Sequence, residues 1–336
     1  MLHDIAKRTL GLDGPEITTI GFGAWAVGGG DWSFSWGPQD DEASIAAMRR
    51  AIEHGVNWID TAAVYGLGHS EQVVGRFLKT LPASDRPLVF TKCGLIWDDS
   101  QRRAAPIRNS QPAVIRRDCD ASLRRLGVDR IDLFQFHWPD ETGTPVEDSW
   151  GEMGRLRDEG KVRYAGVSNF GVPLLERCET IRHVQSLQSP FSLIRRQLAE
   201  TEIPWCESHA TGVLCYSPMQ AGILTDTFSA ARVGAMTEDD WRRRSPEFQE
   251  PNLSANLALR DALRPIADRH RTTVSAIAVA WVTSWPGVTA AIVGARSAEQ
   301  VDGWIGAASV KLASQDLADI AHASDAAAAR KLAVVR

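Results

Sequence analysis

The sequence predicts a (β/α)8 barrel, in which eight parallel strands are each followed by a helix that covers the outside of the sheet. Three observations lead to this prediction. Short apolar runs alternate with amphipathic segments along the chain, the alternation repeats eight times, and no linker rich in Pro, Ser or charge interrupts it. Eight units in 336 residues favour a closed barrel over an open sheet. We therefore expect one domain over residues 1–336, with an N-terminal β-hairpin (1–16), the barrel (17–310), and an extra C-terminal helix and tail (311–336).

Each expected element has its own local signal. The turn Leu12-Asp13-Gly14-Pro15 predicts the hairpin, and apolar runs bounded by polar or turn residues predict the strands. The expected barrel strands are 17–22, 57–60, 88–92, 131–136, 162–167, 184–187, 213–216 and 288–293. Apolar stripes at helical spacing predict the helices. These are 40–55, 70–79, 113–126, 146–159, 173–179, 200–210, the pair 257–270 and 274–285, 298–308, and finally 314–324. Two connections, 94–111 and 217–256, are too long to be simple turns, and we expect them to cover an active site.

The bulk composition excludes several classes of protein. The net charge is −5 with no long basic run, which argues against a nucleic-acid partner. Residues 1–10 lack the apolar core of a signal peptide, and no apolar run is long enough to span a bilayer. The five cysteines show no C-x-x-C spacing, which indicates reduced thiols and no zinc site. We therefore expect a cytoplasmic protein that binds a small molecule, with no metal. Nothing in the sequence marks an oligomer interface.

Polar residues at the ends of three successive strands predict the chemistry. A barrel carries its active site at the C-terminal ends of its strands, where Asp60 and Tyr65, Lys92, and His137 follow one another. A tyrosine with a pKa near 10 is a poor proton donor or acceptor at neutral pH, and a nearby ammonium such as Lys92 should lower that pKa. Asp60 can hold Lys92 charged, and His137 can donate a hydrogen bond to a substrate oxygen. The set suits the addition or removal of a hydride at a carbonyl carbon.

Each of these residues alone has a simpler explanation. A strand-end lysine is most often a surface charge, a lone histidine is most often structural, and a lone aspartate before a loop is usually a cap. Four such groups on one expected rim favour the catalytic interpretation. A second motif is misleading: Gly21-Phe22-Gly23-Ala24-Trp25-Ala26 fits the dinucleotide fingerprint G-x-G-x-x-[GA]. That fingerprint must open a helix at once, whereas here no helix signal comes before Pro38.

Motifs along nearly the whole chain resemble the aldo-keto reductase superfamily. They are Gly21-Phe22-Gly23-Ala24-Trp25, Asn57-Trp58-Ile59-Asp60-Thr61-Ala62 with Tyr65-Gly66-Leu67-Gly68 and Ser70-Glu71, Thr91-Lys92, Leu126-Gly127, Ile131-Asp132-Leu133, His137-Trp138-Pro139, Glu159-Gly160-Lys161-Val162-Arg163, Gly166-Val167-Ser168-Asn169-Phe170, Tyr216-Ser217-Pro218-Met219 and Gly294-Ala295-Arg296-Ser297. The set is most similar to bacterial and plant NADP(H)-dependent members.

The resemblance implies an NADP(H)-dependent carbonyl reductase. Tyr65 would be the general acid, Lys92 and Asp60 its tuning pair, and His137 the group that orients the carbonyl. The residues implied to bind the cofactor are Gly23, Ala24, Trp25, Asp60, Ser168, Asn169, Gln188, Tyr216, Ser217, Pro218, Met219, Ala221, Gly222, Leu224, Gly294, Ala295, Arg296, Ser297 and Gln300. Arg296 suits the 2′-phosphate because a guanidinium binds it through paired hydrogen bonds. An acid and an amide that the family often carries near the adenine are replaced by Gly303 and Trp304. NADH therefore stays as a weaker alternative cofactor.

The substrate and the working direction stay open. Trp32, Trp97 and Trp138 fall in or beside rim loops, and we expect them to contact the substrate, an aldehyde, ketone or sugar. One alternative is a sugar or polyol dehydrogenase that works mainly in the oxidative direction. An alternative from another class is a non-catalytic regulatory or binding subunit that senses NADPH.

Overall fold

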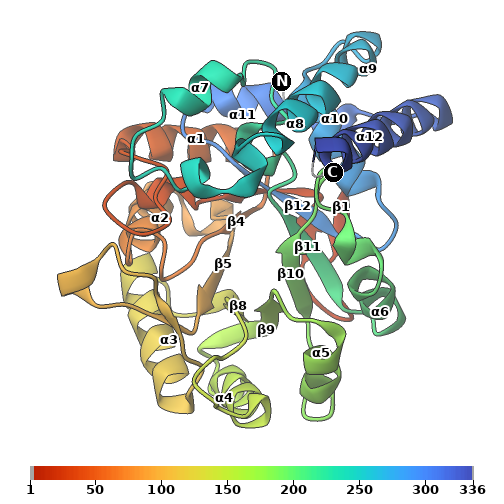
Figure 1. The fold of residues 1–336 in the computed structure, drawn as a ribbon. Coiled ribbons are helices and arrows are strands. Elements are labelled where there is room, and N and C mark those ends of the chain that lie inside the picture. The colour runs from red at the N-terminus through yellow and green to blue at the C-terminus, as the bar shows by residue number, and fades with distance from the viewer. Residues whose placement is uncertain (1–3, 335–336) are drawn as a thin grey trace.

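Eight parallel strands close into a barrel, as the sequence predicts (Figure 1). The computed structural model describes residues 4–334. Residues 1–3 and 335–336, the outer ends of the expected hairpin and tail segments, lie outside the described residues. Around the barrel the strands run in the order β10 (Ser186–Pro190), β11 (Gly212–Tyr216), β12 (Ala290–Gly294), β3 (Ile20–Gly23), β4 (Trp58–Asp60), β5 (Leu88–Cys93), β8 (Ile131–Phe136) and β9 (Val162–Ser168).

Helices surround the barrel and connect successive strands (Figure 1). They are α1 (Asp41–Glu53), α2 (His69–Lys79), α3 (Pro112–Leu126), α4 (Val146–Asp158), α5 (Val172–Glu179), α6 (Glu202–Ser208), α7 (Ala230–Gly234), α8 (Asn252–Ala262), α9 (Arg264–Arg269), α10 (Val274–Ser284), α11 (Ala298–Ile305) and α12 (Ser314–Val334). The Asp40 side chain caps α1 by accepting a hydrogen bond from the Ala43 N–H. Because α1 begins so far beyond Gly23, the glycines of β3 do not open a helix, and the dinucleotide-fingerprint interpretation is excluded.

A hairpin closes the N-terminal end of the barrel. Strands β1 (Lys7–Thr9) and β2 (Glu16–Thr18) pair antiparallel, so the prediction that the barrel strand begins at residue 17 was wrong. Ile17 belongs to the hairpin and packs under the barrel with Leu10. The Trp58 indole N–H donates to the Thr18 carbonyl (2.9 Å) and ties the hairpin to β4. The hairpin therefore covers the end of the barrel that is opposite to the expected active site.

The inside of the barrel is divided into an apolar and a polar layer. Side chains two residues apart on a strand point the same way, so the inward residues stack in layers. Near the hairpin the inward side chains are apolar, namely Trp58, Phe90, Leu133 and Leu214. Two residues further along β4, β5 and β8 the inward side chains are polar, namely Asp60, Lys92 and Gln135. Gln188 of β10 belongs to the same polar layer, and all four side chains are buried. The sequence thus places a desolvated polar layer directly below the C-terminal rim.

The two long connections contain structure of their own. Strands β6 (Leu95–Ile96) and β7 (Ile107–Arg108) form a small antiparallel hairpin within residues 94–111. Residues 217–256 contain short helices around a separate apolar cluster of Ile223, Phe228, Met236, Phe248 and Leu253. Both connections lie on the side of the barrel where the strands end. Each has a defined structure of its own, a hairpin in one and an apolar cluster in the other.

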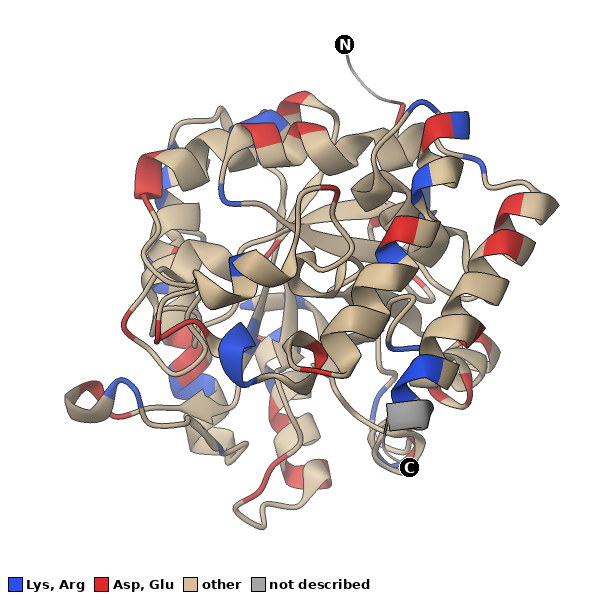
Figure 2. Cartoon of the chain, turned by 45° about the horizontal axis from the view of Figure 1, so that its top comes forward, with Lys and Arg blue, Asp and Glu red and all other residues tan. Residues whose placement is uncertain are grey.

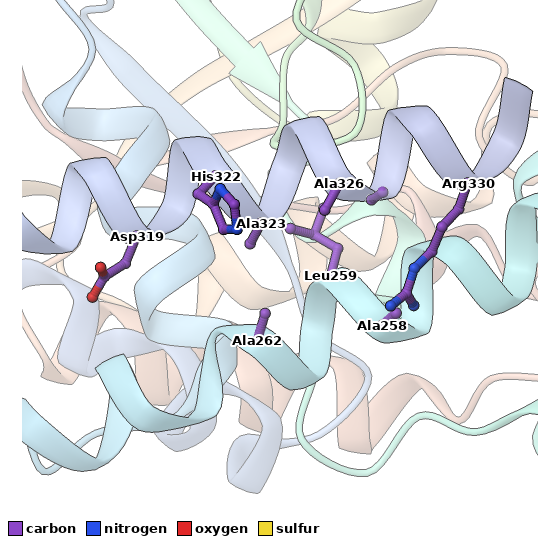
Figure 3. A pocket seen from close by; sticks show the side chains of 9 residues that line it. Ala258, Leu259, Ala262, Asp319, His322, Ala323, Ala326 and Arg330 are labelled. Carbon is purple, nitrogen blue, oxygen red and sulfur yellow. The ribbon is translucent and has the colours of Figure 1, made fainter.

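The C-terminal region differs from its prediction in two places. The expected helix 257–270 is two helices, because Pro265 lacks the N–H that a continuous helix needs at that position. The last helix, α12, extends beyond residue 324 to Val334. Figures 1 and 3 show α12 lying alongside α8, with alanines of both helices at the contact.

Charges of both signs are interspersed along the outer helices on the face shown in Figure 2. Many form ion pairs between neighbouring helices, as Arg76 of α2 does with Asp41 of α1 (2.7 Å). Within residues 4–334, no helix is long and apolar enough to cross a membrane.

Candidate active site

Asp60 and Lys92 form a buried ion pair at the ends of neighbouring strands. The register of β4 and β5 brings the two side chains together, and Lys92 Nζ lies 2.5 Å from Asp60 Oδ1. Lys92 Nζ also donates to the Thr61 carbonyl (2.9 Å), and Gln188 Nε2 donates to Asp60 Oδ2 (2.8 Å). Both charges are thus compensated inside the barrel, as a buried pair must be.

The Tyr65 hydroxyl lies beside this pair, but its pKa differs from the expectation. Lys92 Nζ lies 3.4 Å from the Tyr65 oxygen. Burial, and then the charge of Asp60, raise the pKa of the Tyr65 phenol well above its usual range. The prediction of a lowered pKa was therefore wrong, because burial and the charge of Asp60 outweigh the ammonium of Lys92. Burial also lowers the pKa of Lys92, which Asp60 opposes. At neutral pH Tyr65 is a protonated phenol, able to donate and not to accept a proton.

His137 faces Tyr65 from the end of β8. The two rings meet edge to face, with their centroids 5.5 Å apart and their planes at 78°. Burial, and then the charges of Lys92 and Arg108, lower the pKa of His137 well below its usual value. A neutral imidazole carries one N–H and can donate it to an oxygen beside the Tyr65 hydroxyl. The structure thus brings together all four residues that the sequence selected.

Tryptophans from several loops surround Tyr65. Trp32, Trp97 and Trp138, the expected substrate contacts, belong to one apolar cluster with Tyr65. Trp32 is almost fully buried (2% exposed), so it contributes a wall and little free surface. Trp25 stacks on Tyr65 at 6.1 Å and on Trp241 at 5.1 Å. Sequence analysis missed Trp241, whose place in a long polar connection carried no signal of its contact with the rim.

Three of the residues expected to bind the cofactor form a hydrogen-bonded chain. Asn169 Nδ2 donates to Ser168 Oγ (3.0 Å) and to the His137 carbonyl (3.0 Å), while the Tyr216 hydroxyl donates to Asn169 Oδ1 (2.9 Å). Asn169 has a positive φ of 62°, which turns its side chain back toward the rim. Gln188, by contrast, is directed at Asp60 and at Gln135 (3.3 Å), deeper in the barrel. Gln188, which was expected to bind the cofactor, therefore lies in the polar layer below the rim.

The remaining expected cofactor residues lie around the ends of three neighbouring strands. Gly23 of β3 pairs with Asp60 on one side and Gly294 on the other, and the Ala24 N–H donates to the Asp60 carbonyl (2.8 Å). A side chain at Gly23 would lie 2.7 Å from Ile292, so only glycine fits there. The other expected residues lie beyond β11 and β12. They are Ser217, Pro218, Met219, Ala221, Gly222 and Leu224 after β11, and Ala295, Ser297 and Gln300, with Gly294 and Arg296, at the end of β12 and the start of α11.

The backbone after β11 fits a phosphate group. Met219 is close to the right-handed helical region (φ −94°, ψ 13°), and Gln220 and Ala221 after it are left-handed (φ 46° and 50°). A right-handed residue followed by a left-handed one can make a concave nest of N–H groups that suits an anion. Here the Gln220 N–H already donates to the Ser217 carbonyl (2.9 Å), so the N–H groups of Met219 and Ala221 would have to hold the anion. Gly294 is exposed at the neighbouring strand end. The turn after β11 and the exposed end of β12 therefore lie side by side at the rim.

Arg296 is held by the connection between β3 and α1. Its Nε donates to Gln39 Oε1 (2.7 Å), one Nη donates to the Trp36 carbonyl (3.2 Å), and the other donates to the Pro38 carbonyl. The Gln39 amide in turn donates to the Arg296 carbonyl (2.9 Å). The guanidinium therefore joins two loops at the rim, a contact that the sequence did not predict.

The sequence profile described as the aldo/keto reductase family matches residues 19–325. The chain belongs to the aldo/keto reductase family. Like its relatives, this aldo/keto reductase is an oxidoreductase that acts on carbonyl or alcohol groups with a nicotinamide cofactor.

The names of two relatives of this aldo/keto reductase give different substrates, and one of them gives a cofactor. It is 34% identical to aldo-keto reductase YhdN of Bacillus subtilis, over 91% of this chain and 90% of that one. It is 30% identical to a protein named NADH-specific methylglyoxal reductase of Escherichia coli, over 92% and 95% of the two chains. Among solved structures, the glycerol dehydrogenase AKR11B4 of Gluconobacter oxydans superposes with a TM-score of 0.83 at 35% identity, over 97% of this chain and 95% of that one.

No group of three or more His, Cys, Asp or Glu residues within 4–334 is arranged to hold a metal ion. All five cysteines are free and buried.

Proposed function

We propose that this aldo/keto reductase is an NADP(H)-dependent carbonyl reductase in which Tyr65 is the general acid. The observation that carries the proposal is the position of a protonated phenol 3.4 Å from a buried, Asp60-paired ammonium and edge-to-face with a neutral His137. An acid near a carbonyl oxygen must hold its proton at working pH, and the raised pKa of Tyr65 ensures that it does.

The residues divide the work as follows. The His137 ring donates a hydrogen bond that fixes the substrate oxygen beside the Tyr65 hydroxyl. Tyr65 gives its proton to that oxygen as negative charge develops there, and Lys92 stabilises the phenolate left behind. Asp60 keeps Lys92 in place, and Gln188 in turn holds Asp60. The aromatic cluster around Tyr65 excludes water from the proton transfer.

The bound nicotinamide supplies or accepts the hydride. Tyr216 offers it a stacking face, and Ser168 with Asn169 offers hydrogen bonds to its carboxamide. The nest at Met219 and Gln220 suits the pyrophosphate. Arg296 suits a 2′-phosphate through its charge, which supports NADP(H) as the preferred cofactor and NADH as the weaker one.

The oxidative direction is a second candidate, favoured by the similarity to a glycerol dehydrogenase. In that direction Tyr65 must accept a proton, so its raised pKa disfavours alcohol oxidation at neutral pH and favours it at alkaline pH. The ratio of reduction to oxidation rates at neutral pH distinguishes the two directions.

Tyr65→Phe tests the proposal. It removes the proton donor, so kcat for aldehyde reduction should fall about 100- to 10,000-fold while the Kd for NADPH stays nearly unchanged. Tyr164→Phe is the matched control, because the Tyr164 hydroxyl donates to the Asp13 carbonyl (3.0 Å) at the far end of the barrel. Activity that survives in Tyr65→Phe would refute the assigned acid. A wild-type protein that binds NADPH yet oxidises none with a panel of aldehydes would instead support the regulatory-subunit alternative.

A further inference from the structure

A cavity of about 700 Å³ extends from the catalytic rim toward the C-terminal helix. Its inner wall includes Trp138, which follows His137 directly, and Asn169, which is hydrogen-bonded to the His137 carbonyl. Its outer wall includes Arg195 after β10, Glu247 of the long connection, and Lys331 of α12. Neither Tyr65 nor His137 lines this cavity, but Trp138 and Asn169 connect it to the segment that carries His137. A substrate that reaches past these two residues can extend along the cavity toward charged groups.

Two of these charges are already satisfied by each other. Arg195 donates to Glu247 Oε1 from Nε (2.9 Å), and its Nη2 lies 2.7 Å from the same oxygen. The other Glu247 oxygen accepts a hydrogen bond from Ser245 Oγ (2.5 Å). A further acid in the wall, Glu202, accepts a hydrogen bond from its neighbour Thr201 (2.8 Å). Arg195 and Glu247 thus neutralise each other, and Glu202 leaves one negative charge in the wall.

Lys331 is different because its ammonium has no partner within the part of the chain that the structure describes. Among the described residues, none forms a hydrogen bond or an ion pair with the Lys331 side chain, although that side chain is partly buried. Burial lowers the pKa of Lys331, and the charge of Glu247 opposes this from beyond ion-pair distance. A partly desolvated cation without a counter-charge is costly, and an anionic ligand would compensate it.

The fold holds Lys331 at a defined place. At the start of α12, Asp316 accepts hydrogen bonds from Arg269 (2.7 Å) and pairs with His270 (2.7 Å). Further along, alanines of α12 pack against α8 (Figure 3). Arg330, the residue before Lys331, lines that outer groove between α8 and α12, while Lys331 lines the inner cavity. Adjacent cations of one helix thus face different spaces.

We infer that the substrate of this enzyme carries an anionic group, a carboxylate or a phosphate, at a distance from its carbonyl, and that Lys331 binds that group. The inference rests on the proposed function for the position of the carbonyl. It adds a substrate class and a specificity-determining residue on α12 that the motifs around Tyr65 do not contain.

Paired aldehydes test the inference. We expect the wild-type enzyme to have a higher kcat/KM for succinic semialdehyde than for butanal, and for glyceraldehyde 3-phosphate than for glyceraldehyde. The two pairs distinguish a carboxylate from a phosphate. Lys331→Ala should reduce the charged-over-neutral ratio about 10- to 100-fold, as loss of a charge-assisted hydrogen bond predicts. Arg330→Ala, which removes the adjacent charge from the outer groove, should leave both ratios unchanged. Equal ratios in wild type and Lys331→Ala, or an equal effect of the two variants, would overturn the inference.

A binding measurement separates this inference from the proposed function. Calorimetry with succinate and with neutral succinamide requires no turnover. Succinate should bind more tightly than succinamide to the wild-type protein, and the difference should vanish in Lys331→Ala. A protein that reduces no aldehyde but keeps this Lys331-dependent difference would refute the proposed function alone. A protein that reduces aldehydes but binds both compounds equally would refute the anionic site alone.

Discussion

The proposed catalytic cluster and the Arg296 end of the rim are organised by different kinds of contact. Asp60, Lys92 and Gln188 are buried within the barrel, and the strand register alone brings them together. Arg296 lies at a strand end too, but its hydrogen bonds go to carbonyl and amide groups of the connection between β3 and α1. Side chains carried by strands are thus positioned by local sequence and strand register, and we call them strand-borne. Side chains positioned by contacts between loops, which we call loop-borne, depend on how two distant loops meet.

The largest expected effect comes from breaking the strand-borne cluster at Lys92. Lys92→Met removes the ammonium beside Tyr65, and kcat should fall about 100- to 10,000-fold, because the phenolate formed in the reaction loses its counter-charge. Steady-state kinetics at saturating NADPH measures this. The variant also leaves Asp60 as an unpaired buried charge, so the double variant Asp60→Asn/Lys92→Met is the control. Recovery of thermal stability without recovery of kcat would assign the loss to chemistry, and a kcat close to wild type would contradict the role of Lys92.

A second prediction concerns the helices behind the cluster. Glu71 of α2 is fully buried, and it accepts hydrogen bonds from Thr91, the neighbour of Lys92 (2.6 Å), and from Arg125 of α3 (2.6 Å). Glu71→Gln leaves Arg125 without its counter-charge, and the free energy of unfolding should fall by about 3 to 5 kcal/mol. Urea denaturation measures the change. Glu159→Gln, which breaks the exposed pair with Arg116, should cost far less. Similar losses in both variants would show that burial of the Glu71 pair is unimportant.

The third prediction tests the loop-borne region. Arg296→Leu should weaken NADPH binding about 10- to 100-fold and NADH binding much less, because only NADPH has the 2′-phosphate. Fluorescence titration with both cofactors measures this. Gln39→Ala removes one of the loop contacts of Arg296 but keeps the cation, so the preference for NADPH should survive. Equal weakening of both cofactors by Arg296→Leu would show that Arg296 serves mainly to join the two loops.

The sequence predicted what depends on short-range patterns. Eight strand–helix units, and the meeting of the four proposed catalytic residues at three strand ends, follow from periodicity and from the rule that a barrel carries its site at one rim. The break between α8 and α9 could have been predicted from Pro265, but the apolar stripe over 257–270 favoured one continuous helix. Two other features join segments that are far apart in the chain, so no local pattern predicts them. They are the contact of Trp241 with Trp25 and the position of Lys331 in the cavity wall. The pKa of Tyr65 was misjudged because burial outweighs a nearby ammonium that is already paired.

The smallest expected effect is a shift in the pH dependence of kcat/KM, which separates the influence of burial on the pKa of Tyr65 from that of Asp60. Burial first, and then Asp60, raise the pKa of the phenol, so kcat/KM for reduction should stay level through neutral pH and decline only at strongly alkaline pH, as Tyr65 loses its proton. Asp60→Asn removes the second cause. The pKa of Tyr65 should then fall, and the alkaline decline should begin at a lower pH, with less activity at every pH. A profile of kcat/KM against pH for both proteins measures the shift. An alkaline decline that moves to higher pH in Asp60→Asn would show that the proton whose loss limits activity does not belong to Tyr65. The cluster of Asp60, Lys92 and Tyr65 would then not supply the general acid.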